Sequence, residues 1–189
     1  MINIPNMILV GGNSRNSGKT TIACNIISKL SINQDVIGLK ITGIRPGEKD
    51  FHGNHSEENI SGFSIIEEVD SSAGKDTSRM LEAGARRVFY IRAQDILVRK
   101  AILHFISGYT TTEILVCESR SLRDFFHPGL FLMMNRFPVM GKPKPVAQYI
   151  AKADFTLDFA RQQDEIIQFC RSLDFVDGHF CFSNSLSKA

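Results

Sequence analysis

Short apolar runs alternate with helical stripes along most of this 189-residue chain. The runs end in glycine or a polar residue, as buried parallel strands do, and the stripes repeat every three or four residues, as the inner faces of helices do. The pattern predicts strands at 7–10, 35–41, 88–91, 113–117, 130–134 and 155–157, and helices at 20–30, 76–84, 95–106, 146–151 and 162–173. This alternation predicts an α/β fold of three layers, in which helices wrap both faces of a mostly parallel central sheet. The length suits a single domain over residues 1–189.

Two stretches depart from the pattern. Between Gly43 and Gly74, glycines alternate with acidic and polar residues, no helical period is present, and only 63–69 is typical of a strand. We expect this irregular insertion to be either a functional loop, of the kind that responds to a γ-phosphate in nucleotide switches, or a solvated surface loop. The tail after Asp174 mixes aromatic and polar residues in a way that assigns no element.

A small polar loop joins the first predicted strand to the first predicted helix and ends in Ser-Gly-Lys-Thr-Thr at residues 17–21. This is the layout of a P-loop, whose main-chain N–H groups and helix N-terminus bind a phosphate. Lys19 is expected to reach the β and γ phosphates of a nucleotide, and the hydroxyl of Thr20 is expected to bind Mg²⁺. The predicted nucleotide-binding residues of this stretch are Gly12, Asn13, Ser14, Arg15, Asn16, Ser17, Gly18, Lys19, Thr20 and Thr21.

One position differs from the usual P-loop spacing. A glycine commonly lies five residues before Gly18, and this chain has Asn13 there. Asparagine accepts a left-handed backbone more readily than most residues, so we expect the turn to form with Asn13 in that place. The alternative is a generic Gly/Ser turn that binds nothing, which the strand–loop–helix context of Lys19 and Thr20 disfavours.

Ligands of open α/β sheets bind outside the carboxyl ends of the strands, so the residues that end each strand are candidates. Glu118 ends the strand predicted at 113–117, and its carboxylate could orient Mg²⁺ through water or position an attacking water. Lys19 and Glu118 are therefore the catalytic candidates, and Thr20 and Glu118 are the metal-binding candidates.

Charged residues near the second strand and the helix predicted at 76–84 are candidates on the substrate side. Lys40 lies near the end of that strand, and Lys75 and Asp76 open the helix. Asp76 or Thr77 is the expected N-cap.

The irregular segment also contains acidic residues. The magnesium-linked aspartate expected after the second strand is either Asp50 or Asp70. Asp50 could also form a metal site with His52 and His55, but these residues define no ligand geometry and are more typical of a polar loop.

Two arginines and an asparagine complete the candidates. Arg120 and Arg123 follow Glu118 and are expected to face the phosphates or an anionic substrate. Asn135 ends the strand predicted at 130–134, a position from which P-loop proteins often read a purine. The guanine motif Asn-Lys-x-Asp is absent after it, so the residues alone do not distinguish guanine from adenine.

Composition and charge narrow the classes of partner. A net charge of +2 without a basic, aromatic-rich run gives no indication of nucleic acid, and the apolar runs are too short to span a membrane. The N-terminus lacks the pattern of a secretory signal. The four cysteines have no metal-like spacing and are typical of free thiols in a reducing compartment, which favours the cytoplasm.

The P-loop and two further motifs resemble the molybdopterin-guanine dinucleotide biosynthesis protein B family. The stretch Ala-Gly-Lys-Asp-Thr-Ser-Arg at 73–79, with Glu-Ala-Gly-Ala at 82–85, is similar to that family's Gly-Lys-Asp-Ser and Ala-Gly-Ala motifs. The strand ends Gly-Leu-Lys at 38–40 and Val-Cys-Glu at 116–118 are also similar, and the resemblance covers roughly residues 7 to 120. It implies a homodimeric GTP-binding accessory protein of molybdenum-cofactor guanylylation, with slow hydrolysis and a partner enzyme of cofactor assembly.

Several positions on the substrate side differ from that family. Ser119 replaces a glycine, Arg120-Ser121 replaces Phe-Lys, and Lys40-Ile41-Thr42 replaces a His-rich stretch. We therefore expect Mg²⁺ with GTP or ATP as the ligand and keep two other functions open. One is a small-molecule kinase or ATP-dependent ligase similar to dethiobiotin synthetase, in which Arg120 and Arg123 hold the acceptor. The other is a non-hydrolysing, nucleotide-dependent scaffold that binds a partner through residues 43–74.

Overall fold

The structure is a computed structural model that describes residues 1–44, 62–109, 112–137, 145–160 and 163–183. The elements follow one another as β1 (Ile2–Gly12), α1 (Lys19–Leu30), β2 (Val36–Ile44), β3 (Phe63–Glu68), α2 (Asp76–Glu82), β4 (Arg87–Gln94), η1 (Asp95–Leu97), α3 (Val98–Tyr109), β5 (Ile114–Glu118), η2 (Ser121–Asp124), β6 (Phe126–Asn135), α4 (Ala147–Ile150), β7 (Phe155–Asp158), α5 (Gln163–Ser172), β8 (Leu173–Val176) and β9 (His179–Phe182). Among the described residues, no helix is long and apolar enough to cross a membrane.

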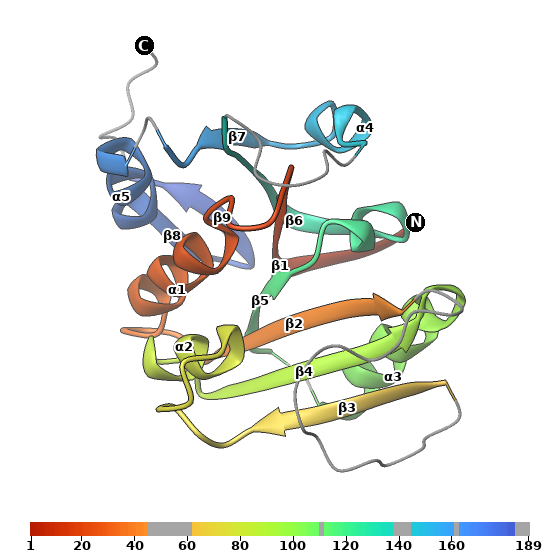
Figure 1. Cartoon of the computed structure of the whole chain (residues 1–189). Helices are drawn as coiled ribbons and strands as arrows, with labels where there is room; N and C mark the ends of the chain where they lie inside the picture. The colour runs from red at the N-terminus through yellow and green to blue at the C-terminus, as the bar shows by residue number, and fades with distance from the viewer. Residues whose placement is uncertain (45–61, 110–111, 138–144, 161–162, 184–189) are drawn as a thin grey trace.

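Seven strands form the central sheet in the order β3-β4-β2-β5-β1-β6-β7 (Figure 1). Every neighbouring pair is parallel except β3 and β4. The edge strand β3 starts opposite the carboxyl end of β4, with Phe63 beside Ala93, so it runs back along the sheet in the opposite direction. The mostly parallel sheet that the sequence predicted is confirmed.

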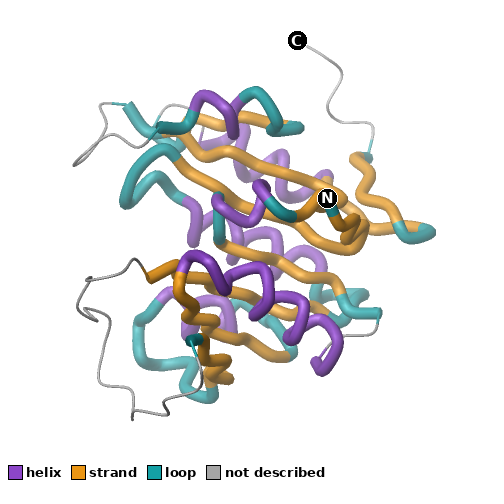
Figure 2. The backbone as a smooth tube through the Cα atoms, turned by 90° about the vertical axis from the view of Figure 1, so that its right-hand side faces the viewer, coloured by secondary structure: helices purple, strands orange, loops and turns teal. Residues whose placement is uncertain are grey.

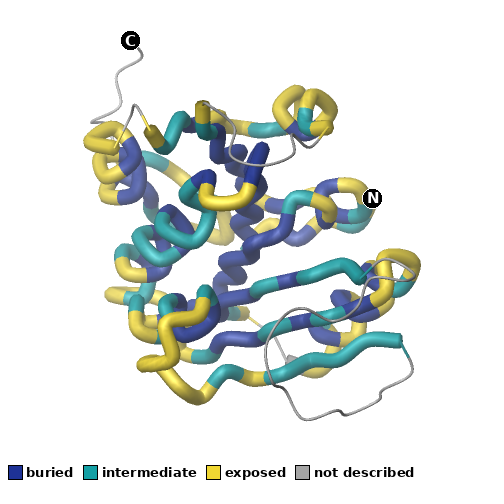
Figure 3. The backbone as a smooth tube through the Cα atoms, in the orientation of Figure 1, coloured by how far each residue is buried: buried dark blue, intermediate teal, exposed yellow. Residues whose placement is uncertain are grey.

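Helices cover both faces of this sheet, which gives the three predicted layers (Figures 1 and 2). Side chains of β1 alternate between two cores because successive residues of a strand point to opposite faces. Ile8 and Val10 pack with α1, α2 and α5, whereas Met7 and Leu9 pack with α3 and α4. Figure 3 shows the result: β1 and β5 are buried over most of their length, and β3 is half-exposed at the edge.

Some elements extend beyond their predicted bounds. β1 begins at Ile2 instead of at residue 7, because Ile2 to Ile4 pair with the start of β6 before a register shift. The helix predicted at 95–106 begins as the 3₁₀ turn η1 and continues as α3. For β1, the hydrophobic pattern located the strand, and its pairing with β6 set where the strand starts.

The tail that the sequence left unassigned forms an antiparallel hairpin, β8–β9, on the same face as α1 and α5. Asp177 and Gly178 join its strands with φ angles of +50° and +80°. Positive φ at both central residues is what a tight hairpin turn requires, and Asp-Gly supplies it at low strain. The rings of Phe175 and Phe180 face each other across the two strands, with centroids 4.7 Å apart.

Candidate functional site

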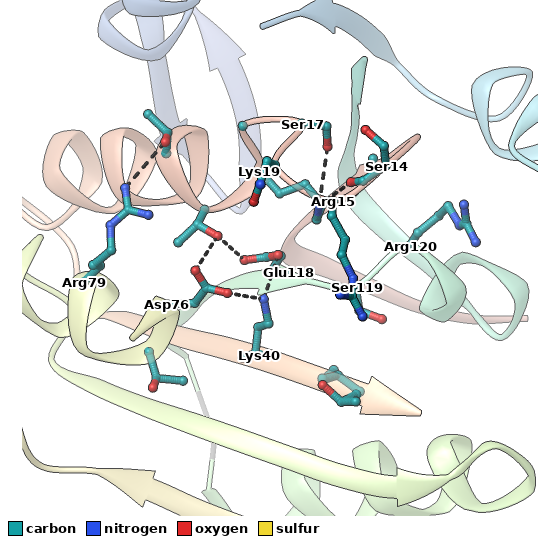
Figure 4. A pocket seen from close by; sticks show the side chains of 18 of the residues that line it. Ser14, Arg15, Ser17, Lys19, Lys40, Asp76, Arg79, Glu118, Ser119 and Arg120 are labelled. Atoms are coloured by element: carbon teal, nitrogen blue, oxygen red, sulfur yellow. Dashed lines mark hydrogen bonds and ion pairs between the residues drawn. The ribbon is translucent and has the colours of Figure 1, made fainter. Parts of the chain in front are cut away.

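A cavity of about 950 Å³ opens at the carboxyl ends of β1, β2 and β5 (Figure 4). The loop after β1 forms one wall, the start of α2 forms another, and the turn after β5 forms a third. Of the residues predicted as functional, those that line it are Gly12, Ser14, Arg15, Asn16, Ser17, Gly18, Lys19, Thr20, Thr21, Lys40, Lys75, Asp76, Glu118 and Arg120.

The P-loop leads directly into the N-terminus of α1. Gly18 is the N-cap with a φ of +87°, and no described side chain caps the helix there. The N–H groups of the first turn are therefore available to an anion in the cavity. A Cβ on Gly18 would lie 2.2 Å from the ring of Phe159, and one on Gly12 would lie 2.3 Å from Ser17 Oγ, so both positions need glycine.

Asn13 does not play the part predicted for it. The left-handed residue of the loop besides Gly18 is Asn16, at φ +56°. Asn13 is instead 5% exposed, and its amide bonds the main chain of Arg136 in both directions, donating to its carbonyl and accepting from its N–H at 3.2 Å each. The Asn13 side chain therefore holds the loop by bonding the main chain just after β6, and Asn13 does not itself adopt a left-handed backbone.

Lys19 folds back over the P-loop. Its ammonium donates to the carbonyl oxygen of Ser14 at 3.0 Å and to Ser17 Oγ at 3.3 Å. Figure 4 places the Lys19 side chain along the loop, next to Ser14 and Ser17. This position suits a cation that transfers from neutral loop oxygens to a bound phosphate.

Four side chains meet next to the P-loop, and we call Thr20, Lys40, Asp76 and Glu118 the acidic corner. The hydroxyl of Thr20 lies 2.9 Å from Asp76 Oδ1 and 2.8 Å from Glu118 Oε2. The ammonium of Lys40 lies 2.5 Å from Asp76 Oδ2 and 2.8 Å from Glu118 Oε1 (Figure 4). Four elements, α1, β2, α2 and β5, each contribute one residue.

The oxygens of the acidic corner fit a hard divalent cation. A hydroxyl has one proton to donate, yet Thr20 Oγ1 faces two carboxylate oxygens that only accept. One hydroxyl and two carboxylates are the oxygen ligands that Mg²⁺ takes from proteins, with phosphate and water completing the shell. Within the described residues no group of three or more His, Cys, Asp or Glu could hold a metal by itself. The corner therefore suits a metal ion that arrives with a phosphate ligand.

The charges of the corner stabilise one another. Burial lowers the pKa of Lys40, but the charge of Glu118 and the hydrogen bonds to both carboxylates outweigh burial and raise the pKa above its ordinary value. For Asp76, burial raises the pKa, and the bond from Lys40 together with its charge lowers it overall. Lys40 and Asp76 are therefore both charged at neutral pH.

Asp76 lies where the sequence analysis expected a different aspartate. The N-cap of α2 is Lys75, not Asp76 or Thr77, because the Asp76 carboxylate is engaged with Thr20 and Lys40. Asp70 is exposed and accepts bonds from the N–H and hydroxyl of Ser72, away from the cavity. Asp50, with His52 and His55, lies outside the described residues.

The two arginines after β5 separate. Arg123 is 7% exposed and donates to the carbonyl of Phe126 at 3.3 Å, so the prediction that it faces the phosphates is wrong. The 3₁₀ turn η2 directs it inward, with its guanidinium 5.9 Å from the ring centroid of Phe131. Arg120 does line the cavity, and its guanidinium stacks over Tyr149 at 4.8 Å.

Asn135 and Phe159 lie on the β6–β7 side of the P-loop. Asn135 is 9% exposed, does not line the cavity, and leaves its buried Oδ1 without a partner among the described residues. Its carbonyl accepts from the N–H of Phe159, whose ring packs on Gly18 and lines the cavity. Sequence reasoning missed Phe159, which lies two residues after the strand predicted at 155–157 and directly after β7 as observed. Applying the strand-end rule to that short strand would have made the residues after it candidates.

Comparisons with known proteins support the fold. No protein-family model matches the chain, and no curated protein matches it. Among solved structures, the chain is similar to LpxK from Aquifex aeolicus, determined in complex with ATP, with a TM-score of 0.51 and 18% identity. The match covers 95% of this chain and 54% of LpxK, so the chain spans about half the length of that protein. Together with the sheet order and the P-loop, this likeness gives the chain an α/β P-loop NTPase fold.

Proposed function

We propose that the chain binds a nucleoside triphosphate together with Mg²⁺ in this cavity and hydrolyses it slowly. The observation that carries the proposal is the acidic corner beside the P-loop, in which Thr20, Asp76 and Glu118 present oxygens to one point. A P-loop without such a corner would bind any phosphate, whereas the two carboxylates of the corner favour a phosphate ligand that carries a divalent cation. LpxK, which shares the fold, was determined with ATP, and this supports a nucleotide as the ligand.

Each residue has a part in this proposal. The N–H groups of residues 14 to 19 and the ammonium of Lys19 hold the phosphates, because both are cationic or donor groups at a helix N-terminus. Thr20, Asp76 and Glu118 would hold Mg²⁺, directly or through water, and Mg²⁺ in that place would neutralise charge on the β and γ phosphates. Glu118, which is 4% exposed, also fixes Lys40 and is the candidate to orient an attacking water.

Nucleotide binding is tested by calorimetry with a panel of GTP, ATP and their diphosphates, with and without Mg²⁺. We expect micromolar binding of a triphosphate that needs Mg²⁺, and a loss of about 100-fold or more in Lys19→Ala, because a charge-assisted phosphate contact is removed. Lys29→Ala is the matched control, since Lys29 is on the same helix but pairs with Asp174 at 2.7 Å. Full nucleotide affinity in Lys19→Ala would contradict the proposal.

For the pathway, we propose a GTP-binding accessory role in molybdenum-cofactor assembly, on the resemblance of residues 73–85 and of the P-loop to the protein B family. The helix that carries this motif, α2, contributes Asp76 to the acidic corner, so the motif lies beside the proposed nucleotide and metal. This role predicts a preference for GTP over ATP in the same calorimetric panel. It also predicts a homodimer by light scattering and capture of a cofactor-assembly enzyme only when GTP is bound.

A second candidate is phosphoryl transfer to a small molecule, as in a kinase or ATP-dependent ligase. The cavity extends past the acidic corner to Thr42, Tyr90 and Arg120, which leaves room for an acceptor beside a bound triphosphate. With γ-labelled ATP and a metabolite extract, transfer would give a labelled organic product, whereas plain hydrolysis gives labelled inorganic phosphate. The scaffold alternative rests on residues 43–74, and positions 45–61 of that segment lie outside the described residues.

A further inference from the structure

Lys40 is the residue of the acidic corner that a metal site does not require. Its ammonium lies between Asp76 Oδ2 and Glu118 Oε1, at 2.5 and 2.8 Å, while the Thr20 hydroxyl faces the other oxygen of each carboxylate. All four carboxylate oxygens of the corner are therefore engaged. Only 22% of the Lys40 side chain and 4% of the Glu118 side chain are exposed, so the pair is poorly screened by water.

The charges of the corner explain why a cation is needed there. Asp76 and Glu118 would repel each other, because both carboxylates lie within hydrogen-bond distance of the same Thr20 hydroxyl and like charges destabilise one another in a partly buried site. The ammonium of Lys40 supplies one positive charge against two negative ones. A divalent cation in the same place would supply two, but it would lie within contact distance of the ammonium and be repelled by it.

We propose that Lys40 is an internal substitute for the divalent cation: its ammonium holds the two carboxylates together in the nucleotide-free protein and excludes free metal ions from the corner. The metal then enters only as its nucleotide complex, whose phosphates supply further ligands and help to displace Lys40. This inference rests on the metal-binding role proposed above for the corner. It adds a binding order to that role: the metal ion binds together with the nucleotide and not before it.

The test uses Mn²⁺ as the probe, since the electron paramagnetic resonance signal of free Mn²⁺ is lost on binding. Wild-type protein and Lys40→Met are titrated with Mn²⁺ in the absence of nucleotide. We expect Lys40→Met to bind Mn²⁺ at least about tenfold more tightly than wild type, because one repelling charge has been removed from a site that keeps both carboxylates. Glu118→Gln in the Lys40→Met background should abolish the gained binding.

Lys29→Met is the control for charge, because it removes an equivalent ion-paired lysine far from the corner and should bind Mn²⁺ as wild type does. Thermal unfolding gives a second readout. Mn²⁺ should raise the midpoint of Lys40→Met, which has lost its internal cation, and leave wild type and Lys29→Met unchanged. If Lys40→Met does not fold, Lys40→Gln carries the same comparison, because it also removes the ammonium charge and keeps a polar side chain at position 40.

Equal Mn²⁺ affinities in wild type and in the Lys40 variant would overturn the proposal, and Lys40 would then be a permanent ion-pair partner. Tight binding of Mn²⁺ by wild type without nucleotide would overturn it as well. The proposed function fails differently, by an absence of nucleotide binding in wild type. That result would not change the comparison of Mn²⁺ affinities, so the two failures can be told apart.

Discussion

Two groups of charged side chains on this sheet are built in different ways. In the acidic corner, four residues from four elements share contacts, and one hydroxyl proton serves two carboxylates. At the β3 edge of the sheet, Arg87 of β4 and Glu67 of β3 form a bidentate ion pair, and both hydrogen bonds measure 2.7 Å. The pair is exposed at 37% and 40%, and the Arg87 guanidinium also lies 4.7 Å from the ring centroid of Phe89.

The Arg87–Glu67 pair stabilises the surface by itself, whereas the acidic corner has an arrangement suited to binding a ligand. Arg87 and Glu67 match each other in charge, number and geometry, so nothing further is required of the pair. In the corner, one ammonium faces two carboxylates, and the single proton of the Thr20 hydroxyl can bond only one of the two carboxylate oxygens that it faces. A fold selected for stability alone would not need this partly buried excess of negative charge. Breaking each group should therefore have different consequences for stability and for ligand binding.

The largest effect is expected from Glu118→Gln. Glu118 is 4% exposed, and its loss leaves the partly buried Lys40 with Asp76 as its remaining carboxylate in the corner. We expect a loss of about 2 to 3 kcal/mol in the free energy of unfolding, somewhat less than for a buried charge left entirely alone. Urea unfolding measures this loss, and calorimetry should show that nucleotide affinity no longer depends on Mg²⁺. If Glu118→Gln kept the wild-type free energy of unfolding and the wild-type dependence of nucleotide affinity on Mg²⁺, the corner would not differ from the Arg87–Glu67 pair as proposed.

Asn13→Ala should have the next largest effect, and it sharpens the contrast because Asn13 lies beside the site yet is fully matched. Its amide exchanges two bonds with the Arg136 main chain and accepts a third from Ser14 at 3.1 Å. We expect a loss of about 1 to 2 kcal/mol in the free energy of unfolding, measured with urea, because the part-buried main-chain groups of Arg136 lose their partner. Asn13→Asp, which keeps the acceptor but not the donor, is the matched comparison. Stability equal to wild type in Asn13→Ala would mean that water replaces these bonds.

The contrast also explains what the sequence could and could not predict. The positions of most strands and helices, the inner face of the first helix and the P-loop motif follow from local patterns, such as the apolar run at 7–10 that enters a Gly-rich loop. The partners of Asn13 and the corner depend on residues far apart in the chain, at 13 and 136, or at 20, 40, 76 and 118. Propensity describes the backbone of a residue and not the distant side chains that it meets. The sequence therefore predicts Asn13 in the turn and Asp76 as a substrate-side residue or helix cap, and does not predict the contacts of Asp76 with Thr20 and Lys40.

Arg123 shows the opposite error. Arg120 lines the cavity, and the position of both arginines just after Glu118 led to the prediction that both would face it. The turn η2 rotates the chain between them, so that Arg123 is buried against Phe126 and Phe131. Charge alone favoured a solvent-facing or ligand-facing position, and a buried guanidinium bonded to a main-chain carbonyl leaves no mark in the sequence.

Asp76→Asn tests the corner from its exposed side. The Asp76 side chain is 42% exposed, so its removal should cost about 1 kcal/mol in unfolding free energy, less than the change at Glu118. The effect on ligand binding should nevertheless equal that of Glu118→Gln, because both carboxylates are proposed to hold the same cation. Calorimetry with and without Mg²⁺ measures this. A variant that lost stability but kept its Mg²⁺ dependence would assign Asp76 to the fold and not to the metal.

Glu67→Gln should have the smallest effect and leave nucleotide binding unchanged. Exposed pairs contribute about 0.5 kcal/mol, and this one is held by good geometry at an edge strand. The hydrogen bonds from Arg87 hold the pKa of Glu67 below its ordinary value of 4.5, against a small opposing effect of burial. The stabilisation is therefore present above pH 4.5 and is lost as the pH falls through the lowered pKa. Urea unfolding of wild type and variant should differ at pH 7 and converge once the pH is below the lowered pKa of Glu67, as the linkage requires. A difference that persisted in acid would come from packing of the side chain and not from its charge.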